Sequence, residues 1–179
     1  MAQDTIKCYD TPSDVVAALA EDFIAFTNEE ISRTETCIVG ITGGTVINGL
    51  LETLNSAEYI ERVNWERIFF VWTDERFLPQ SHEDNYFNRV KPYLLCKAKG
   101  AAHFFPINTN SKTVIEAADE YEKEIGNVLK ACKKSGLDLA ILDLGEDGHT
   151  AGLFAGSHAL RVADRNVRSE ERRVGKECR

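Results

Sequence analysis

Short apolar runs alternate along this chain with stretches in which apolar residues recur every three or four positions. The runs at residues 36–41, 67–73, 103–107 and 137–144 have the length and apolar content of strands, and the run at 67–73 is rich in β-branched and aromatic residues. Helical patterns occupy the segments between them. Because strands that alternate with helices pair in parallel through right-handed crossovers, the pattern predicts an α/β fold. We expect a three-layer, Rossmann-like domain with a mostly parallel sheet flanked by helices.

The first predicted helix has both a start signal and an apolar face. The sequence Thr11-Pro12-Ser13-Asp14 supplies a hydroxyl cap, a proline at the first helical position and an acid in the first turn. The positions expected to face the core are Val15, Val16, Leu19, Phe23 and Phe26. Further helices are expected from residue 45 through Leu54, over 84–95 and over 114–129, and residues 6–9 are a candidate first strand.

Length and composition limit the domain organisation. The 179 residues suit one domain with a sizeable core, and no linker divides them. We assign residues 1–167 to a single α/β domain and expect its sheet to be incomplete at the C-terminus. Residues 168–179 contain Val174 and Cys178 as their only apolar side chains, so two interpretations stay open: a disordered tail or a non-native terminus.

The charge balance and the cysteines exclude several classes of protein. A net charge of −8 and a pI near 5.1 argue against a nucleic-acid partner. No apolar run approaches the ~20 residues that cross a bilayer, and no signal peptide is recognisable, so we expect no membrane partner. The cysteines are odd in number and form no C-x-x-C pair, which indicates reduced thiols in a cytoplasmic protein. They are Cys8, Cys37, Cys96, Cys132 and Cys178.

Polar loops follow three of the predicted strands, at residues 42–45, 74–76 and 145–150. The carboxyl ends of parallel strands meet at one edge of a sheet, and α/β folds bind ligands there. We therefore expect the three loops to converge.

The first two loops are suited to bind a phosphate. Thr42-Gly43-Gly44-Thr45 places two glycines and two hydroxyls at a helix start, where free N–H groups and the helix dipole favour an anion. A simple tight turn is the alternative. In the second loop the planar guanidinium of Arg76 suits a phosphate, with Asp74 and Glu75 holding the arginine or contacting hydroxyls. A surface ion-pair cluster is the alternative there.

The third loop carries the candidate catalytic pair. His149 can take a proton from water near neutral pH, and Asp147 can orient its ring or stabilise the charged form. Gly145 and Gly148 permit a sharp turn and leave room for a substrate. A structural or solvent-facing histidine is the alternative. His82 and His103 lack a metal-ligand spacing with His149, so no metal site is predicted.

Taken together, the three loops resemble the 6-phosphogluconolactonase family, within the larger group that includes glucosamine-6-phosphate deaminase. The similarity covers roughly residues 5–165. The matching residues are Thr42-Gly43-Gly44-Thr45; Asp74-Glu75-Arg76, Leu78-Pro79, His82 and Asp84-Asn85-Tyr86; and Gly145-Glu146-Asp147-Gly148-His149-Thr150, followed by Gly152-Leu153-Phe154-Ala155-Gly156.

The chain departs from the family pattern at a few positions. Asp143 stands where the family strand is usually apolar, Gly152 where a small hydroxyl residue is typical, and Ala155 where proline is typical. Asp84 stands where serine is common. Family members continue with further strands and basic substrate contacts. The resemblance therefore implies a C-terminally truncated domain and leaves open whether this chain is active.

The resemblance implies a reaction and a set of site residues. The reaction is hydrolysis of 6-phospho-D-glucono-1,5-lactone to 6-phosphogluconate in the oxidative pentose phosphate pathway, without cofactor or metal. His149 is the expected general base on water, positioned by Asp147. The implied substrate-binding residues are Thr42, Gly43, Gly44, Thr45, Asp74, Arg76 and Gly148.

Two rival functions remain. A glucosamine-6-phosphate deaminase typically continues after its histidine with Ile-Ala-Phe-Asn-Glu-Pro, whereas this chain has Thr150-Ala151-Gly152-Leu153-Phe154 and lacks that glutamate. A non-catalytic sugar-phosphate-binding fragment would bind ligand without turnover. Some relatives are fused to glucose-6-phosphate dehydrogenase, so fusion to or association with that enzyme in the parent protein is a further expectation.

Overall fold

The computed structural model describes residues 5–95 and 102–169, and in these ranges strands alternate with helices as predicted. The strands are β1 (Cys37–Ile41), β2 (Ile68–Trp72), β3 (His103–Phe105) and β4 (Leu139–Ile141). The α-helices are α1 (Pro12–Thr34), α2 (Thr45–Leu54), α3 (Tyr86–Leu95) and α4 (Val114–Ala131). Short 3-10 turns are η1 (Ile60–Arg62), η2 (Trp65–Arg67) and η3 (His158–Arg161).

The four described strands form one parallel sheet in the order β3-β2-β1-β4. The central strand β1 is buried along its whole length, which its apolar sequence predicts. Ile41 at its end pairs with Trp72 of β2 and with Ile141 of β4. The carboxyl ends of these three strands therefore lie side by side at one edge.

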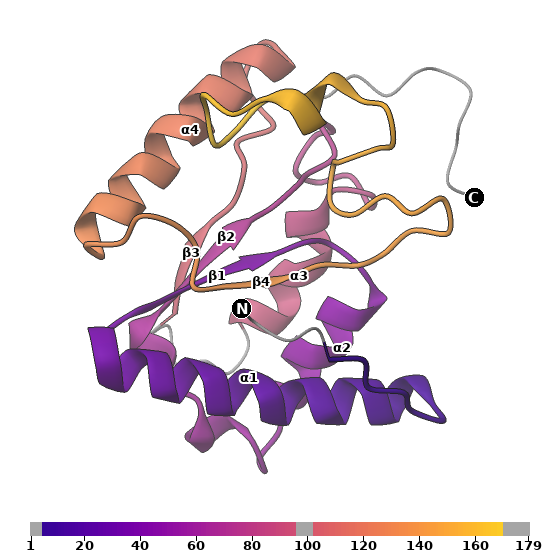
Figure 1. Ribbon diagram of the computed structural model, residues 1–179, viewed down its shortest axis with the longest axis vertical. Helices are drawn as coiled ribbons and strands as arrows, with labels where there is room; N and C mark the ends of the chain where they lie inside the picture. The colour runs from indigo at the N-terminus through magenta and orange to yellow at the C-terminus, as the bar shows by residue number, and fades with distance from the viewer. Residues whose placement is uncertain (1–4, 96–101, 170–179) are drawn as a thin grey trace.

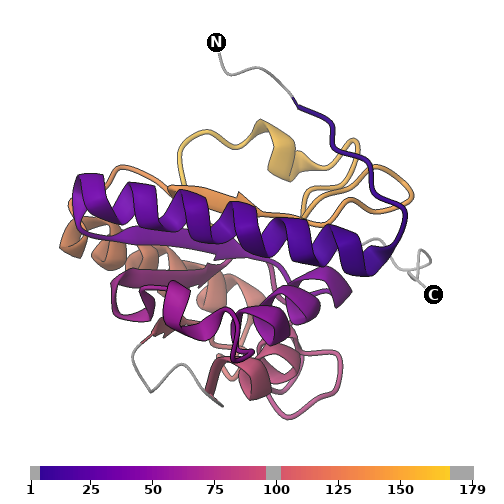
Figure 2. The ribbon, with the colours of Figure 1, turned by 90° about the horizontal axis from the view of Figure 1, so that it is seen from below.

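Helices cover both faces of the sheet, which confirms the predicted three-layer α/β fold. Figure 1 shows α4 on one side and α1 and α2 on the other, and Figure 2 shows α1 lying along its face of the sheet. On the α1 side, Phe23 stacks on Phe70 of β2 with ring centroids 6.3 Å apart, and Phe87 of α3 meets Trp72 edge-on. On the other side, the Tyr121 hydroxyl of α4 donates to the carbonyl of Phe105 at 2.9 Å.

The signal for the start of α1 is confirmed in detail. Thr11 Oγ1 accepts from the backbone N–H of Asp14 at 3.2 Å, and the Asp14 carboxylate accepts from the N–H of Thr11 at 3.2 Å. This reciprocal capping box satisfies two donors that the first turn otherwise leaves free. The predicted core face is partly wrong, because Val15 and Phe26 are exposed and Ala20 and Ile24 are buried instead.

Two strand predictions need correction. Residues 6–9 form no strand, and Ile6 is 89% exposed, because no described strand lies beside them to complete a ladder. The strand predicted over 137–144 contracts to β4, since its neighbour β1 ends at Ile41 and offers no further partner groups. Of the predicted tail 168–179, residues 170–179 lie outside the described residues. No helix in the described ranges is long and apolar enough to cross a membrane.

Candidate active site

The three predicted loops converge at the carboxyl edge of β1, β2 and β4. Thr42 Oγ1 donates to Asp74 Oδ1 at 2.5 Å, which joins the first loop to the second. Gly152 lies close to Asp74, since a Cβ built on Gly152 would be 3.8 Å from the Asp74 Cβ. The Asp143 carboxylate reaches Gly44, so the segment between β4 and the third loop lies against the first loop.

The Gly43-Gly44 turn is closely packed: a side chain on Gly43 would clash with Tyr86, and one on Gly44 would displace the Asp143 carboxylate. A Cβ on Gly43 would lie 2.0 Å from the ring of Tyr86, and one on Gly44 would lie 1.9 Å from Asp143 Oδ2. Gly44 is also the N-cap of α2 and makes no side-chain cap hydrogen bond. The start of α2 therefore presents backbone N–H groups to the site, as a phosphate-binding turn requires.

Asp74 is a largely buried acid whose position is fixed by Thr42. Burial raises the pKa of the Asp74 carboxyl, while the hydrogen bond from Thr42 and the charge of Arg76 act in the opposite direction. Thr42 itself is only 3% exposed. The predicted role of Thr42 in substrate binding stays a prediction, and Thr45 at the first position of α2 is exposed.

Arg76 is held by Tyr86, and in the described part of the chain it forms no side-chain ion pair with Asp74 or Glu75. The other role expected of these two acids, contact with substrate hydroxyls, stays a prediction. Its Nε donates to the Tyr86 hydroxyl at 3.1 Å, and its guanidinium carbon lies 5.2 Å from the centre of the Tyr86 ring. A cation held along an aromatic ring keeps its other N–H donors available for a ligand.

Glu75 has a structural role that the sequence analysis missed. Its carboxylate accepts from the backbone N–H groups of Arg76 at 2.7 Å, Tyr86 at 2.7 Å and Phe87 at 2.9 Å. It therefore caps α3 and ties the second loop to the helix that carries Tyr86. Asn85 caps the same helix through Asn88, which explains why α3 begins two residues later than predicted.

The side chains of His149 and Asp147 contact each other as predicted. Asp147 Oδ1 is hydrogen-bonded to Nδ1 of His149 and also accepts from the His149 backbone N–H at 3.3 Å. This contact lowers the pKa of the Asp147 carboxyl. With Nδ1 engaged, Nε2 is the ring nitrogen that can exchange a proton with a ligand or water.

The His149 ring is fixed on its faces as well as at Nδ1. It stacks on Phe154 with centroids 4.6 Å apart and lies against Gly145, where a Cβ would be 2.3 Å from the ring. The side chain is 18% exposed, so the ring is largely buried but a water molecule or ligand can still reach it. Gly148 has a φ of 80°, a left-handed conformation that favours glycine, and its N–H closes the turn by donating to the Gly145 carbonyl at 2.9 Å.

Tyr86 and Asp143 join the site in addition to the predicted residues. Tyr86 belongs to the second matching motif, and Asp143 interrupts the apolar residues 139–144, so both left a signal in the sequence. His103 stacks on Phe69 at the other end of β3, and His82 accepts from the N–H of Asp84. In the part of the chain that the structure describes, no group of three His, Cys, Asp or Glu side chains is arranged to hold a metal ion.

Comparison with known proteins gives consistent matches. A family model described as glucosamine-6-phosphate isomerases/6-phosphogluconolactonase matches residues 10–176. A probable 6-phosphogluconolactonase 1 of Oryza sativa is 29% identical over 170 residues, covering 89% of this chain and 56% of the relative. The chloroplastic 6-phosphogluconolactonase 3 of Arabidopsis thaliana is 29% identical over 164 residues, covering 87% of this chain and 50% of the relative.

The fold has solved counterparts. The crystal structure of a 6-phosphogluconolactonase from Shewanella baltica superposes with a TM-score of 0.73 at 22% identity, covering 86% of this chain and 62% of that one. This likeness establishes the fold. The chain spans about half the length of the curated relatives that it matches.

Proposed function

The chain belongs to the glucosamine-6-phosphate isomerase/6-phosphogluconolactonase family, and we propose that it is the part of a 6-phosphogluconolactonase that carries the catalytic histidine. The proposed substrate is 6-phospho-D-glucono-1,5-lactone and the product is 6-phosphogluconate. The observation that carries the proposal is the pairing of His149 with Asp147 in the loop after β4, at the same sheet edge as the Gly43-Gly44 turn and Arg76.

In the proposed reaction His149 acts as general base and then as general acid. Its Nε2 takes a proton from a water molecule as the water oxygen bonds to the lactone carbonyl carbon. The tetrahedral intermediate then breaks its bond to the ring oxygen, which receives the proton from the imidazolium. Asp147, bonded to Nδ1, orients the ring and stabilises the imidazolium between the two steps. The resulting carboxylic acid ionises, so the step consumes one water and needs no redox partner.

The 6-phosphate is proposed to bind at the start of α2. Gly43, Gly44 and Thr45 offer backbone N–H groups there, Arg76 offers its guanidinium, and Gly148 leaves room beside His149. Asp74, held by Thr42, is placed to accept from sugar hydroxyls. Such contacts would orient the lactone from a point remote from the reacting carbon.

The deaminase alternative is not favoured. The chain lacks the glutamate that the deaminase loop carries after its histidine, and the relatives reported above are named 6-phosphogluconolactonases. We propose a cytoplasmic protein, because the described cysteines, Cys8, Cys37 and Cys132, are free thiols. Association with glucose-6-phosphate dehydrogenase is a further proposal, and co-purification of the two proteins would test it.

The function is tested by lactonase activity on freshly generated 6-phosphogluconolactone. The product is measured with 6-phosphogluconate dehydrogenase and corrected for spontaneous hydrolysis. We expect turnover above the spontaneous rate, together with faster turnover than on glucono-1,5-lactone, which lacks the phosphate. Ligand binding without turnover would instead identify a non-catalytic sugar-phosphate-binding fragment.

Replacing Arg76 by alanine is expected to raise KM for the phosphorylated lactone by about 10- to 100-fold with a smaller change in kcat. A hydrogen bond to a charged group contributes about 1.5–3 kcal/mol, which corresponds to this range. Steady-state kinetics on both lactones checks the prediction, because the change should leave KM for glucono-1,5-lactone nearly constant. An unchanged KM for the phosphorylated lactone would exclude the phosphate role.

A further inference from the structure

The carboxylate of Asp143 lies beside Gly44, one of the residues proposed to bind the substrate phosphate. Its Oδ2 would lie 1.9 Å from a Cβ on Gly44, the residue that caps α2. The backbone at Asp143 is fixed, since its carbonyl accepts from Thr150 Oγ1 at 3.0 Å. Asp143 therefore places a carboxyl group beside the first turn of α2 in the ligand-free protein.

A phosphate that binds to the same turn would meet this charge. Asp143 is half-buried, and burial raises the pKa of its carboxyl. Asp74 adds a second carboxylate nearby, whose pKa is raised mainly by burial and further by the charge of Asp143. The second loop and α3 bring Glu75, Arg76 and Tyr86 to the same region.

The loop of Asp143 itself contributes further titratable groups, namely Glu146, Asp147 and His149. Asp147 is engaged by the His149 ring. Arg76 is thus the permanent cation among these groups. A phosphate dianion beside two carboxylates would therefore leave an excess of negative charge at the turn, and uptake of a proton by one carboxyl group would reduce that excess.

We propose that Asp143 is a specificity-determining residue that takes up a proton when a phosphorylated ligand binds at the N-terminus of α2. In its neutral form the carboxyl group can donate a hydrogen bond to a phosphate oxygen, whereas its ionised form repels a phosphate held beside Gly44. The site then prefers phosphate esters at lower pH and releases them as the pH rises. This inference rests on the proposed binding of the 6-phosphate at Gly43 and Gly44.

The test measures binding of 6-phosphogluconate by titration calorimetry between pH 7 and pH 8.5, where a phosphate monoester is already largely a dianion. For the unaltered chain we expect affinity to weaken at least threefold for each pH unit, because one proton must be taken up. For Asp143→Asn, which keeps the shape and the donor but cannot ionise, we expect little pH dependence and at least tenfold tighter binding at pH 8. Gluconate, which lacks the phosphate, should show neither effect.

Proton uptake can also be measured directly by repeating the titrations in two buffers that differ in ionisation enthalpy. The unaltered chain should take up more protons than Asp143→Asn, and Asp143→Ala provides a second variant should the first fold poorly. Weaker binding by Asp143→Asn, an unchanged pH dependence or no binding by either protein would overturn the inference. Lactone turnover is measured separately, so a failure of the proposed function would be recognised independently.

Discussion

Replacing His149 by alanine is expected to reduce kcat for 6-phosphogluconolactone by about 10²–10⁴-fold, the contribution typical of a positioned general base. Nε2 of His149 is the proton acceptor in the proposed reaction, and alanine leaves the attacking water without one. The coupled dehydrogenase assay, corrected for spontaneous hydrolysis, measures the loss.

The fold should survive this replacement. The ring contributes contacts with Phe154 and Gly145 at the edge of the molecule, and the hydrogen bonds of the turn are made by its backbone. His103→Ala is a matched control, because His103 is an exposed histidine at the opposite end of a strand of the same sheet. We expect this control to keep nearly full activity.

Normal turnover by His149→Ala would exclude the proposed mechanism. Asp147→Asn separates the two members of the pair, because the amide keeps the size of the side chain and loses the charge that stabilises the imidazolium. A kcat lowered in Asp147→Asn but less than in His149→Ala would support a positioning role for Asp147. Equal kcat values for Asp147→Asn and the unaltered chain would show that the Asp147 carboxylate does not contribute to turnover.

The layout of the fold was predictable because it depends on short-range patterns. The apolar run of β1 and the capping signal at Thr11 each specify one element, and parallel pairing then brings the loops to one edge. The candidate strand at residues 6–9 failed for the opposite reason. A strand exists only beside a partner, and a single sequence does not state which partners are available.

The contacts inside the site were less predictable. The motifs indicate that Gly44, Arg76 and His149 belong together, but no local pattern specifies that Asp143 points at Gly44 or that Tyr86 holds Arg76. Glu75 likewise differs from its expected role, because capping of α3 depends on a helix that starts eleven residues later. Such pairings are set by the packing of one element on another. Sequence patterns indicate which loops lie together, but not which side chains within those loops make contact.

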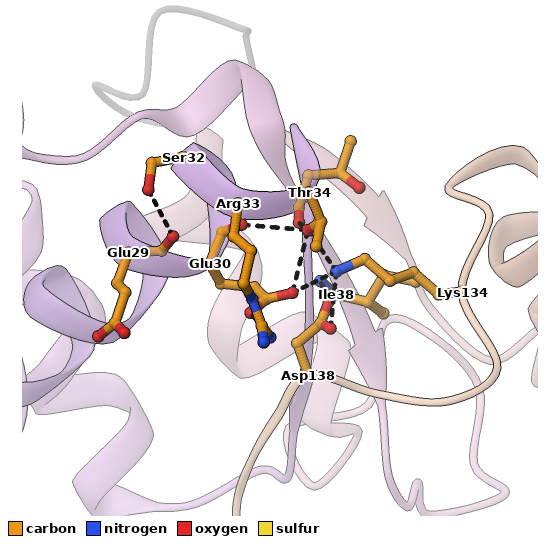
Figure 3. A network of polar contacts seen from close by, with 9 residues as sticks. Glu29, Glu30, Ser32, Arg33, Thr34, Ile38, Lys134 and Asp138 are labelled. Carbon is orange, nitrogen blue, oxygen red and sulfur yellow. Dashed lines mark hydrogen bonds and ion pairs between the residues drawn. The ribbon is translucent and has the colours of Figure 1, made fainter.

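A buried ionic network at the opposite edge of the sheet was not predicted at all. Figure 3 shows Lys134, which follows α4, between Glu30 of α1 and Asp138 ahead of β4. Lys134 Nζ donates to Glu30 Oε1 at 2.6 Å and to Asp138 Oδ1 at 2.8 Å. Their side chains are 9%, 6% and 12% exposed in that order, so these charges are largely removed from water.

The network connects three parts of the fold. Thr34 Oγ1 accepts a further hydrogen bond from Lys134 at 2.6 Å, and Asp138 Oδ2 accepts from the backbone N–H of Ile38 in β1 at 2.8 Å. Arg33 forms an ion pair with the second oxygen of Glu30. Lys134 therefore holds the end of α1 to the segment that enters β4.

Replacing Lys134 by methionine is expected to lower the free energy of unfolding by about 3–5 kcal/mol, because it leaves Glu30 and Asp138 buried without their shared partner. Equilibrium urea unfolding at pH 7 measures the change. Lys123→Met is the matched control, since Lys123 is an exposed lysine on α4, and it should change stability by less than about 0.5 kcal/mol. Equal effects of the two replacements would show that the network does not stabilise the fold.

The same network predicts how stability depends on pH. The hydrogen bond from Lys134, followed by that from Arg33, lowers the pKa of Glu30 from 4.5 to about 2. A carboxyl group with a lowered pKa in the folded state stabilises the protein above its unfolded pKa and loses that effect as the pH falls through its folded pKa.

The destabilisation caused by Glu30→Gln should therefore be largest at neutral pH and shrink as the pH falls from about 4.5 towards 2. In Lys134→Met the main cause of the low pKa is gone, so protonation of Glu30 should cost less stability and the pH dependence between about 4.5 and 2 should be smaller than in the unaltered chain. A Glu30→Gln effect that is constant from pH 7 to pH 3 would show that Glu30 is not held ionised by its partners.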